Sequence, residues 1–333
     1  MSRSLTLSVG IPAFNQGEFL EETILSLLSQ TRPPDEIVVS DHHSTDSTPD
    51  VIAKYAKHVR AVKPPAGTNL TYQYNFTLQS QTGDWITLLS SDDVARPNFC
   101  EVLARGAAAV DDAALVRAAW ENIDPQGKQV SVNYFLRAPR IESPPSTVTS
   151  QAVGPRVSFA AFALKREAYL ASGPIPADFE SLSDWALFVQ MAPFGSFVYE
   201  SEIISGYRVG HDGDKFRRRL PMWLRDEQRM FNQVLPLAAQ RAKIADTSFI
   251  AEASRANFVR YLTAAQKLSL EERAEIIPIF TPWARATGPE SESLLRLFAE
   301  GRPLPRTLRS YLKQGKSLLR PLAQRLHAAF ERR

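Results

Sequence analysis

Two adjacent carboxylates, Asp92 and Asp93, follow a buried apolar run that ends at Leu89. Neighbouring acids repel each other unless a cation or hydrogen bonds offset their charge, and Mg²⁺ is commonly bound by one or two carboxylates together with substrate phosphates. Such an ion would neutralise a phosphate leaving group. An exposed turn that caps the next helix would carry the same pair, so the pair alone leaves both interpretations open.

A third carboxylate, Asp41, ends an apolar run over Glu36 to Ser40. At the carboxyl end of a strand it could accept from the ring N–H of a base or from ribose hydroxyls; a plain loop start is the alternative. His42 and His43 follow directly, but adjacent side chains of an extended loop point apart, so we expect no shared metal. Asp46 precedes Pro49 in what reads as an ordinary helix entry.

Two further residues lie in the second half of the chain. Asp184 precedes an apolar helical pattern, where it could be a general base for an acceptor hydroxyl or a first-turn helix acid. His211 follows Tyr207-Arg208 in a predicted loop, where it could bind a metal or a phosphate, or be a surface side chain.

The elements that must position the first acids alternate between strand and helix. We predict strands over 5–11, 36–40 and 85–89 and helices over about 16–28, 49–58 and 69–80, with Asn15 and Glu18 forming a capping box for the first helix. This alternation is typical of βαβ units with a parallel sheet, whose ligands bind at the carboxyl ends of the strands. The polar loops 12–17, 41–46 and 90–93 should therefore meet at one crevice.

The rest of the chain is less regular. Strands are predicted over 115–120, 159–164, 197–199 and 203–209, a loop region over 126–149 and a short helix over 184–191. Beyond about residue 215 the pattern is helical. We therefore predict a catalytic domain over 1–215 and a helical region over 216–333.

Composition excludes several classes of protein. The 333 residues are 44% hydrophobic and 23% charged, as in ordinary globular chains. Cys100 is the single cysteine, so no intrachain disulfide is possible, and a reducing compartment fits. No run approaches the roughly 20 apolar residues that span a bilayer. We therefore expect a cytoplasmic protein.

The basic charge is concentrated at the end of the chain. Residues 302–333 hold nine Lys or Arg and one acid, a net charge of about +8, whereas the whole chain has a net charge of +3. Leucines recur in this segment at helical spacing around Pro321. A basic amphipathic helix can lie on an anionic membrane surface, which would place the protein peripherally on the inner face of the cytoplasmic membrane. The alternative is a helix that packs on the catalytic domain. Aromatic residues for stacking on bases are sparse, so we expect no nucleic-acid partner.

Together these segments resemble the family 2 glycosyltransferases, which have the GT-A fold. The resemblance covers about residues 5–212 and is carried by five ordered pieces. They are Ser8-Val9-Gly10-Ile11-Pro12-Ala13-Phe14-Asn15; the run from Glu36 to Asp46; Asn75 with Gly83-Asp84-Trp85-Ile86 and Leu89-Ser90-Ser91-Asp92-Asp93; Asp184; and Tyr207-Arg208 with His211.

The resemblance implies a Rossmann-like α/β fold with a mostly parallel sheet flanked by helices, and transfer of a sugar from a nucleoside-diphosphate sugar to an acceptor hydroxyl with inversion. Donor-binding residues would be Pro12, Phe14, Asn15, Asp41 and Asp92. Asp93 would ligate Mg²⁺ or Mn²⁺, with His211 completing the site, and Asp184 would be the general base. The implied acceptor is a saccharide or a lipid-linked saccharide in the synthesis of a bacterial surface polysaccharide.

The chain departs from the family pattern at four positions. His42-His43 replace the usual Asp/Asn-Gly, Ser90 a frequent Asp, Tyr74 a common Arg, and Ser183 the acid usually paired with Asp184. A nucleotidyltransferase would need a basic Gly-rich loop, and 12–17 contains no Lys or Arg. A degenerate transferase fold that acts as a scaffold through its helical tail is the non-enzymatic alternative.

Overall fold

The computed structural model describes residues 5–134, 138–152, 154, 159–210 and 215–305. Contacts divide the chain into two compact units. The first consists of residues 1–143, 156–178 and 194–213, and the second of 144–155, 179–193 and 214–333. The division at residue 215 stays a prediction, because two short earlier segments group with the C-terminal helices.

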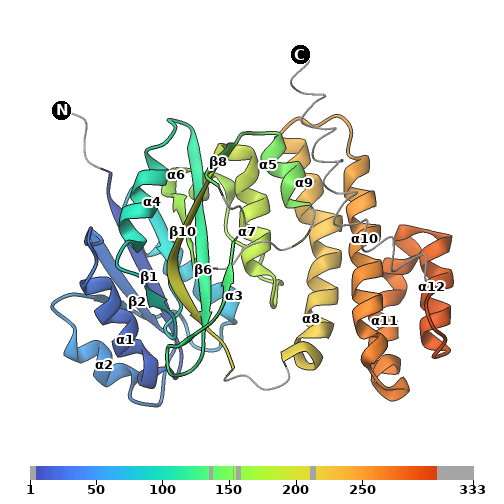
Figure 1. Ribbon diagram of the computed structural model, residues 1–333, viewed down its shortest axis with the longest axis horizontal. Helices are drawn as coiled ribbons and strands as arrows, with labels where there is room; N and C mark the ends of the chain where they lie inside the picture. Colours follow the sequence, from blue (N-terminus) through green and yellow to red (C-terminus); the bar gives the residue numbers. More distant parts are fainter. Residues whose placement is uncertain (1–4, 135–137, 153, 155–158, 211–214, 306–333) are drawn as a thin grey trace. The chain divides into compact units, whose positions relative to one another are not determined.

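The first unit is built on a mixed sheet (Figure 1). Among the described residues, its strands have the order β3-β2-β1-β4-β9-β6-β10-β5, with β7 beside β6 and β8 beside β10. Their bounds are β1 Leu7–Ala13, β2 Glu36–Asp41, β3 Arg60–Val62, β4 Trp85–Leu88, β5 Val94–Ala95, β6 Ala113–Ile123, β7 Gln129–Asn133, β8 Arg140–Glu142, β9 Phe162–Lys165 and β10 Ser196–Arg208.

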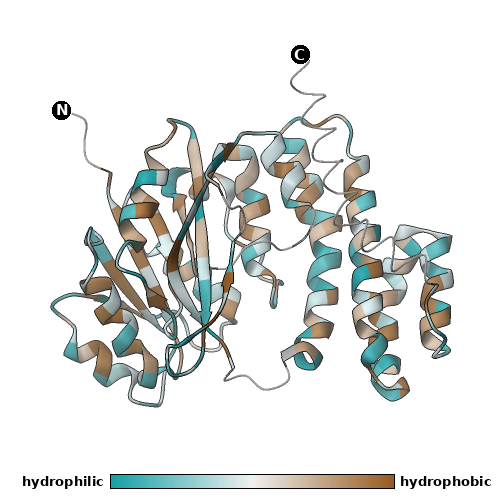
Figure 2. Ribbon diagram, in the orientation of Figure 1, coloured by the Kyte–Doolittle hydropathy of each residue, from teal (hydrophilic) through white to brown (hydrophobic). Residues whose placement is uncertain are grey.

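The strands that lead to the predicted acids form the parallel half of this sheet. β1 pairs in parallel with β2 on one side and with β4 on the other, and β2 pairs in parallel with β3. Figure 2 shows hydrophobic residues concentrated on these strands, and all seven residues of β1 are buried. A strand that is covered on both faces is apolar along most of its length, which is why the short runs were recognisable in the sequence.

Helices of the first unit follow the strands. They are α1 Gly17–Leu28, α2 Thr48–Lys54, α3 Leu70–Gln79, α4 Phe99–Ala107 and α6 Arg166–Ser172. Leu20, Ile24 and Leu27 of α1 are fully buried in the core together with strand residues such as Val9 and Val39. The helical spacing of the apolar residues therefore selects the face that covers the sheet.

The second unit is helical. Its elements are α5 Ser146–Gln151, α7 Ser183–Met191, α8 Lys215–Arg229, a π-helical turn Met230–Val234, α9 Leu235–Arg241, α10 Ser248–Ala264, α11 Leu270–Thr287 and α12 Pro289–Ala299. Its core is aromatic: Trp283 stacks with Phe231 and Phe280, with ring centroids 6.4 and 6.3 Å apart, and meets Phe258 edge-on. Among the described residues, no helix combines the length and the apolar character needed to cross a membrane.

Four sequence predictions were wrong. The first strand does not end at Pro12 but continues to Ala13, because Pro12 keeps its place in the ladder opposite Ser40. Asn15 does not cap α1; Gln16 holds that position, and Asn15 has a φ of 49° and binds another loop.

The other two errors lie in the middle of the chain. Residues 126–149 are not a loop region, since β7, β8 and the start of α5 lie there. The two strands predicted over 197–209 are the single irregular strand β10, whose register against β6 shifts between Tyr199 and Ser205. Long-range pairing with β6 and β8 builds these strands, and local patterns do not report such pairing.

Candidate active site

Three polar loops leave the parallel half of the sheet at the same edge. The loop after β1 begins at Phe14, the loop after β2 follows Asp41, and the loop after β4 holds Asp92 and Asp93. β1 lies between β2 and β4, so the starts of the three loops are neighbours. The loops predicted to line one crevice thus follow adjacent parallel strands, at their carboxyl ends.

The first two loops are bound to each other by hydrogen bonds. The Asn15 backbone N–H donates to Ser44 Oγ at 3.0 Å, and Asn15 Oδ1 accepts from the Thr45 N–H at 2.8 Å. The Gly17 N–H donates to Asp46 Oδ2 at 2.9 Å. Asn15 and Asp46 therefore fix the shape of the loops, which explains why α1 has lost the cap that the sequence predicted.

Asp41 is buried at the end of β2. Its Oδ1 accepts from the Ser44 N–H at 2.9 Å, and its Oδ2 lies 3.6 Å from Nζ of Lys63, which follows β3. Lys63 was missed by the sequence analysis, because nothing local connects it with Asp41. The pair gives this edge of the sheet both an acceptor and a cation.

An exposed aromatic ring lies beside His42, the residue after Asp41. Phe14 is 54% exposed, and its ring centroid lies 5.9 Å from that of His42. His42 Nε2 lies 2.9 Å from Thr68 Oγ1, whereas His43 Nε2 lies 2.9 Å from the Pro64 carbonyl oxygen. The two histidines thus have different partners. Burial lowers the pKa of His42, and the neighbouring His43 lowers it further.

The loop after β4 is held from inside. Asp93 is fully buried, and its Oδ1 accepts the backbone N–H of Arg208 at 2.9 Å, while Asp92 is half-buried. Thr23 Oγ1 of α1 lies 2.7 Å from the Asp93 carbonyl oxygen and 3.0 Å from that of Ser91. The backbone that presents both acids therefore has fixed partners.

Arg208, at the end of β10, is the main missed residue of this site. It is 2% exposed, and its Nε donates to the Asp92 carbonyl oxygen at 2.7 Å. Its terminal nitrogens donate to the Pro125 carbonyl oxygen at 2.7 Å and to Glu22 Oε2 at 2.6 Å. The guanidinium also lies 4.7 Å from the ring centroid of Phe19. The sequence analysis named Arg208 only as part of the Tyr207-Arg208 motif and gave it no role, because its burial depends on strand pairing.

A divalent cation would be held by oxygen ligands at this loop, and two carboxylates are chemically suitable. Within the described ranges, however, no three His, Cys, Asp or Glu side chains form a group that could hold a metal ion. His211, the predicted additional ligand, lies outside the described residues. The donor set is therefore of the right kind but incomplete.

Asp184 belongs to the second unit. It is half-buried in the first turn of α7, and its Oδ1 accepts the Trp185 backbone N–H at 2.7 Å. α7 is anchored by Trp185, whose Nε1 donates to the Gln151 carbonyl oxygen at 2.7 Å.

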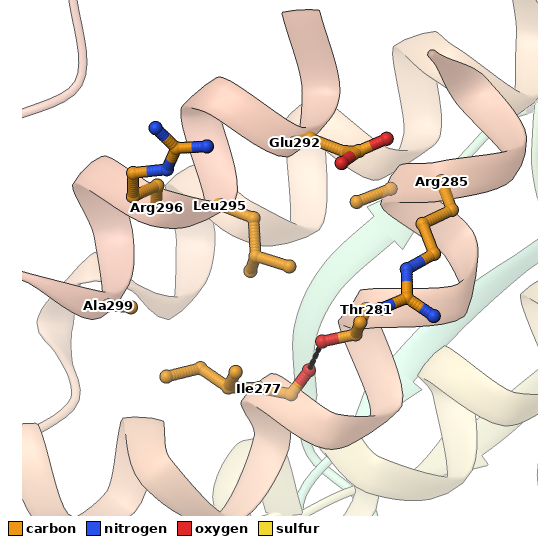
Figure 3. Close-up of a pocket in the computed structure, with 8 residues that line it drawn as sticks. Ile277, Thr281, Arg285, Glu292, Leu295, Arg296 and Ala299 are labelled. Carbon is orange, nitrogen blue, oxygen red and sulfur yellow. Dashed lines mark hydrogen bonds between the residues drawn. The ribbon is translucent and has the colours of Figure 1, made fainter. Parts of the chain in front are cut away.

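A pocket of about 230 Å³ in the second unit is formed by α11 and α12 alone (Figure 3). Its polar lining includes Arg285, Arg296 and Glu292, around an apolar floor that contains Ile277 and Leu295. None of the predicted site residues lines it, so it is not the candidate active site.

Comparison with known proteins identifies the family that the first half of the chain resembles. The family model described as glycosyl transferase family 2 matches residues 8–169, a segment that contains Asp41, Asp92 and Asp93. This segment of the chain belongs to that family.

Curated relatives include the putative teichuronic acid biosynthesis glycosyltransferase TuaG of Bacillus subtilis, 30% identical over 26% of this chain and 36% of that protein. The poly(ribitol-phosphate) β-N-acetylglucosaminyltransferase TarP of Staphylococcus aureus is 36% identical over 29% of this chain and 31% of that protein. The matches therefore span about a third of the length of these relatives.

Solved structures match over most of the chain. Residues 1–349 of S. aureus TarS, in complex with UDP-GlcNAc, align with a TM-score of 0.64 and 15% identity over 95% of this chain and 92% of that one. The mannosyltransferase PcManGT from Pyrobaculum calidifontis, in complex with GDP-Man and Mn²⁺, aligns with a TM-score of 0.53 and 19% identity over 90% and 86%. The fold is thus the GT-A fold with a helical C-terminal region, as predicted.

Proposed function

We propose that this protein is an inverting glycosyltransferase that uses a nucleoside-diphosphate sugar. The observation that carries the proposal is the placement of Asp41 and of the Asp92-Asp93 loop at the ends of β2 and β4, on either side of β1, within the family 2 segment. In parallel sheets this edge is where nucleotides bind.

The donor's nucleoside would lie along the first two loops. Pro12 lies in β1 just before the first loop, and Asn15 fixes the shape of that loop. The exposed Phe14 offers an aromatic face, and Asp41 offers a buried carboxylate to a base N–H or to ribose. Stacking and hydrogen bonding of this kind orient a nucleoside without determining the sugar.

The diphosphate would lie at the Asp92-Asp93 loop. A divalent cation such as Mg²⁺ or Mn²⁺, held there with His211, would supply charge neutralisation for the leaving diphosphate. Asp92 is the more accessible of the two acids, since the Asp93 side chain is fully buried. Asp92 would contact the ribose or the shell of the cation, and Asp93 would ligate the cation.

We propose Asp184 as the general base that takes the proton from the acceptor hydroxyl, on the strength of the sequence resemblance and its place in the first turn of α7. In-line attack by that hydroxyl on the anomeric carbon inverts its configuration. The names of TuaG and TarP support a cell-surface polymer as the product class. A lipid-linked saccharide acceptor at the cytoplasmic face fits that class.

The membrane prediction for 302–333 rests on sequence alone, since residues 306–333 lie outside the described part. The basic amphipathic pattern of this segment would bring the enzyme to an anionic inner leaflet.

A thermal-shift panel tests the proposal. UDP, GDP and dTDP are each added with Mn²⁺, Mg²⁺ or EDTA to the wild type and to the Asp92→Ala and Asp93→Ala variants. A ligand that binds the folded state alone raises the free energy of unfolding, by about 2.7 kcal/mol at a ligand concentration of 100 times Kd, and so raises the melting temperature. We expect one diphosphate to give a metal-dependent shift that both variants lose. No shift with any diphosphate would refute the proposal and favour the scaffold alternative.

A further inference from the structure

The start of α7 is held by a side chain from another helix. The residue before the helix is Leu182, whose apolar side chain cannot accept a hydrogen bond. Instead, Asp226 of α8 accepts three successive backbone N–H groups, from Glu180 at 3.1 Å, Ser181 at 2.7 Å and Leu182 at 2.9 Å, all on its Oδ2. One carboxylate oxygen thus accepts hydrogen bonds from the three backbone N–H groups that precede α7.

The same helix makes further contacts with this segment. Trp223 Nε1 donates to Ser181 Oγ at 3.0 Å, and Arg225 Nε donates to Glu180 Oε1 at 3.0 Å. The hydrogen bond from Arg225 is the largest cause of a lowered pKa of Glu180. Three side chains of α8 therefore bind residues 180–182, one residue from the start of α7.

Asp226 is fully buried and its charge is paired. Arg229, one turn further along α8, donates to Asp226 Oδ1 at 2.9 Å. A carboxylate in such a site cannot exchange its partners for water, and N–H groups that lose it are left without an acceptor. The backbone dihedral angles of 180–182 are consequently fixed by the position of α8.

We propose that Asp226 is a positioning residue for the reaction: through residues 180–182 it sets the place and direction of the first turn of α7, where Asp184 lies two residues after Leu182. This inference rests on the proposed role of Asp184 as the general base. It gives the helical C-terminal region a part in catalysis, because a base that is misplaced by about an ångström loses much of its rate advantage.

Four variants of the full chain test the inference: Asp184→Asn, Asp226→Asn, the double variant, and Glu227→Gln. Glu227 is the matched control, since it is the next residue of α8, equally buried, and pairs with Arg260 at 2.9 Å instead of with residues 180–182. The donor is the nucleoside-diphosphate sugar whose nucleotide gives the largest thermal shift, with water as the acceptor. The readouts are kcat and KM for release of the diphosphate.

We expect Asp226→Asn to lower kcat about tenfold with donor KM unchanged within about twofold, and Asp184→Asn to lower kcat by about 100-fold. A residue that acts through Asp184 adds no further loss in the Asp184→Asn background, whereas independent effects multiply. Glu227→Gln should retain wild-type kcat. Equal fractional losses in both backgrounds, an unaffected Asp226→Asn variant, or a loss of the same size in Glu227→Gln would overturn the inference.

Two measurements separate this inference from the proposed function. If Asp184→Asn has wild-type kcat, the assignment of the base is wrong and the inference fails with it. If Asp184→Asn is impaired and Asp226→Asn has wild-type kcat, the inference alone is wrong. Should Asp226→Asn fail to fold, Trp223→Phe removes a single hydrogen bond to Ser181. It should lower kcat two- to threefold, again without further loss in the Asp184→Asn background, and wild-type kcat in Trp223→Phe would then count against the inference.

Discussion

Replacement of Arg208 by lysine separates the structural role of this buried cation from its role at the donor loop. Lysine keeps the charge but has one nitrogen in place of the guanidinium fork. Arg208 donates to the Asp92 and Pro125 carbonyl oxygens, both at 2.7 Å, and to Glu22. A single ammonium group cannot reach all three acceptors, so at least one buried carbonyl oxygen loses its donor.

The size of the effect follows from these contacts. Each buried carbonyl oxygen that loses a charged donor costs about 1–3 kcal/mol. The Glu22 side chain is 52% exposed, so loss of its ion pair adds only about 0–1 kcal/mol. We expect Arg208→Lys to lower the free energy of unfolding by about 1–4 kcal/mol. Each kcal/mol lost should lower the melting temperature by roughly 2–4 °C.

The donor loop should respond as well. Nε of Arg208 binds the carbonyl oxygen between the two acids of the Asp92-Asp93 loop, so the variant must order that loop when the nucleotide binds. One lost hydrogen bond of about 1.4 kcal/mol corresponds to about a tenfold rise in Kd. The assay is titration calorimetry with the diphosphate selected by the thermal-shift panel, in the presence of Mn²⁺ and well below the melting temperature of the variant.

Arg117→Lys is the matched control. Arg117 is as buried as Arg208, and its guanidinium lies 5.5 Å from the ring centroid of Tyr199. It lies in the middle of β6, so its replacement should lower stability and leave the Kd of the nucleotide unchanged. A Kd that is unaffected by Arg208→Lys, or raised equally by both variants, would refute the argument that Arg208 orders the donor loop.

Three further predictions concern stability and reactivity. Gly17→Ala should cost about 1–3 kcal/mol, because its Cβ would lie 2.1 Å from Ser47 Oγ; an unchanged midpoint of urea unfolding would contradict this. Burial raises the pKa of Glu227 to about 7, above its ordinary 4.5, so the folded state binds a proton that the unfolded state lacks and stability should fall as the pH rises from about 4.5 to 7. The comparison is with Glu227→Gln, and equal slopes in the two proteins would exclude this origin. Burial raises the pKa of the Cys100 thiol to about 12, so a disulfide reagent should label it only in urea, and rapid labelling of the folded protein would show that the site opens.

Much of the parallel half of the sheet was predictable from local pattern. The short apolar runs became β1, β2 and β4, and the helix predicted over 69–80 became α3, whose first residue follows Asn69. Asn69 caps this helix by accepting the Tyr72 N–H at 2.8 Å. Each of these features depends on residues close in the sequence. The same local logic failed at Asn15, whose side chain binds Thr45 of a different loop.

The sequence by itself determined which acids follow strand ends and in what order, because an apolar run and the polar residue that ends it are contiguous. Only the tertiary structure decided what holds those acids. Arg208 comes 115 residues after Asp93, and Asp226 comes 44 residues after Leu182, yet both are buried against the backbone that they fix. Burial and hydrogen-bond direction arise from the packing of distant elements, and no pattern of neighbouring residues encodes them.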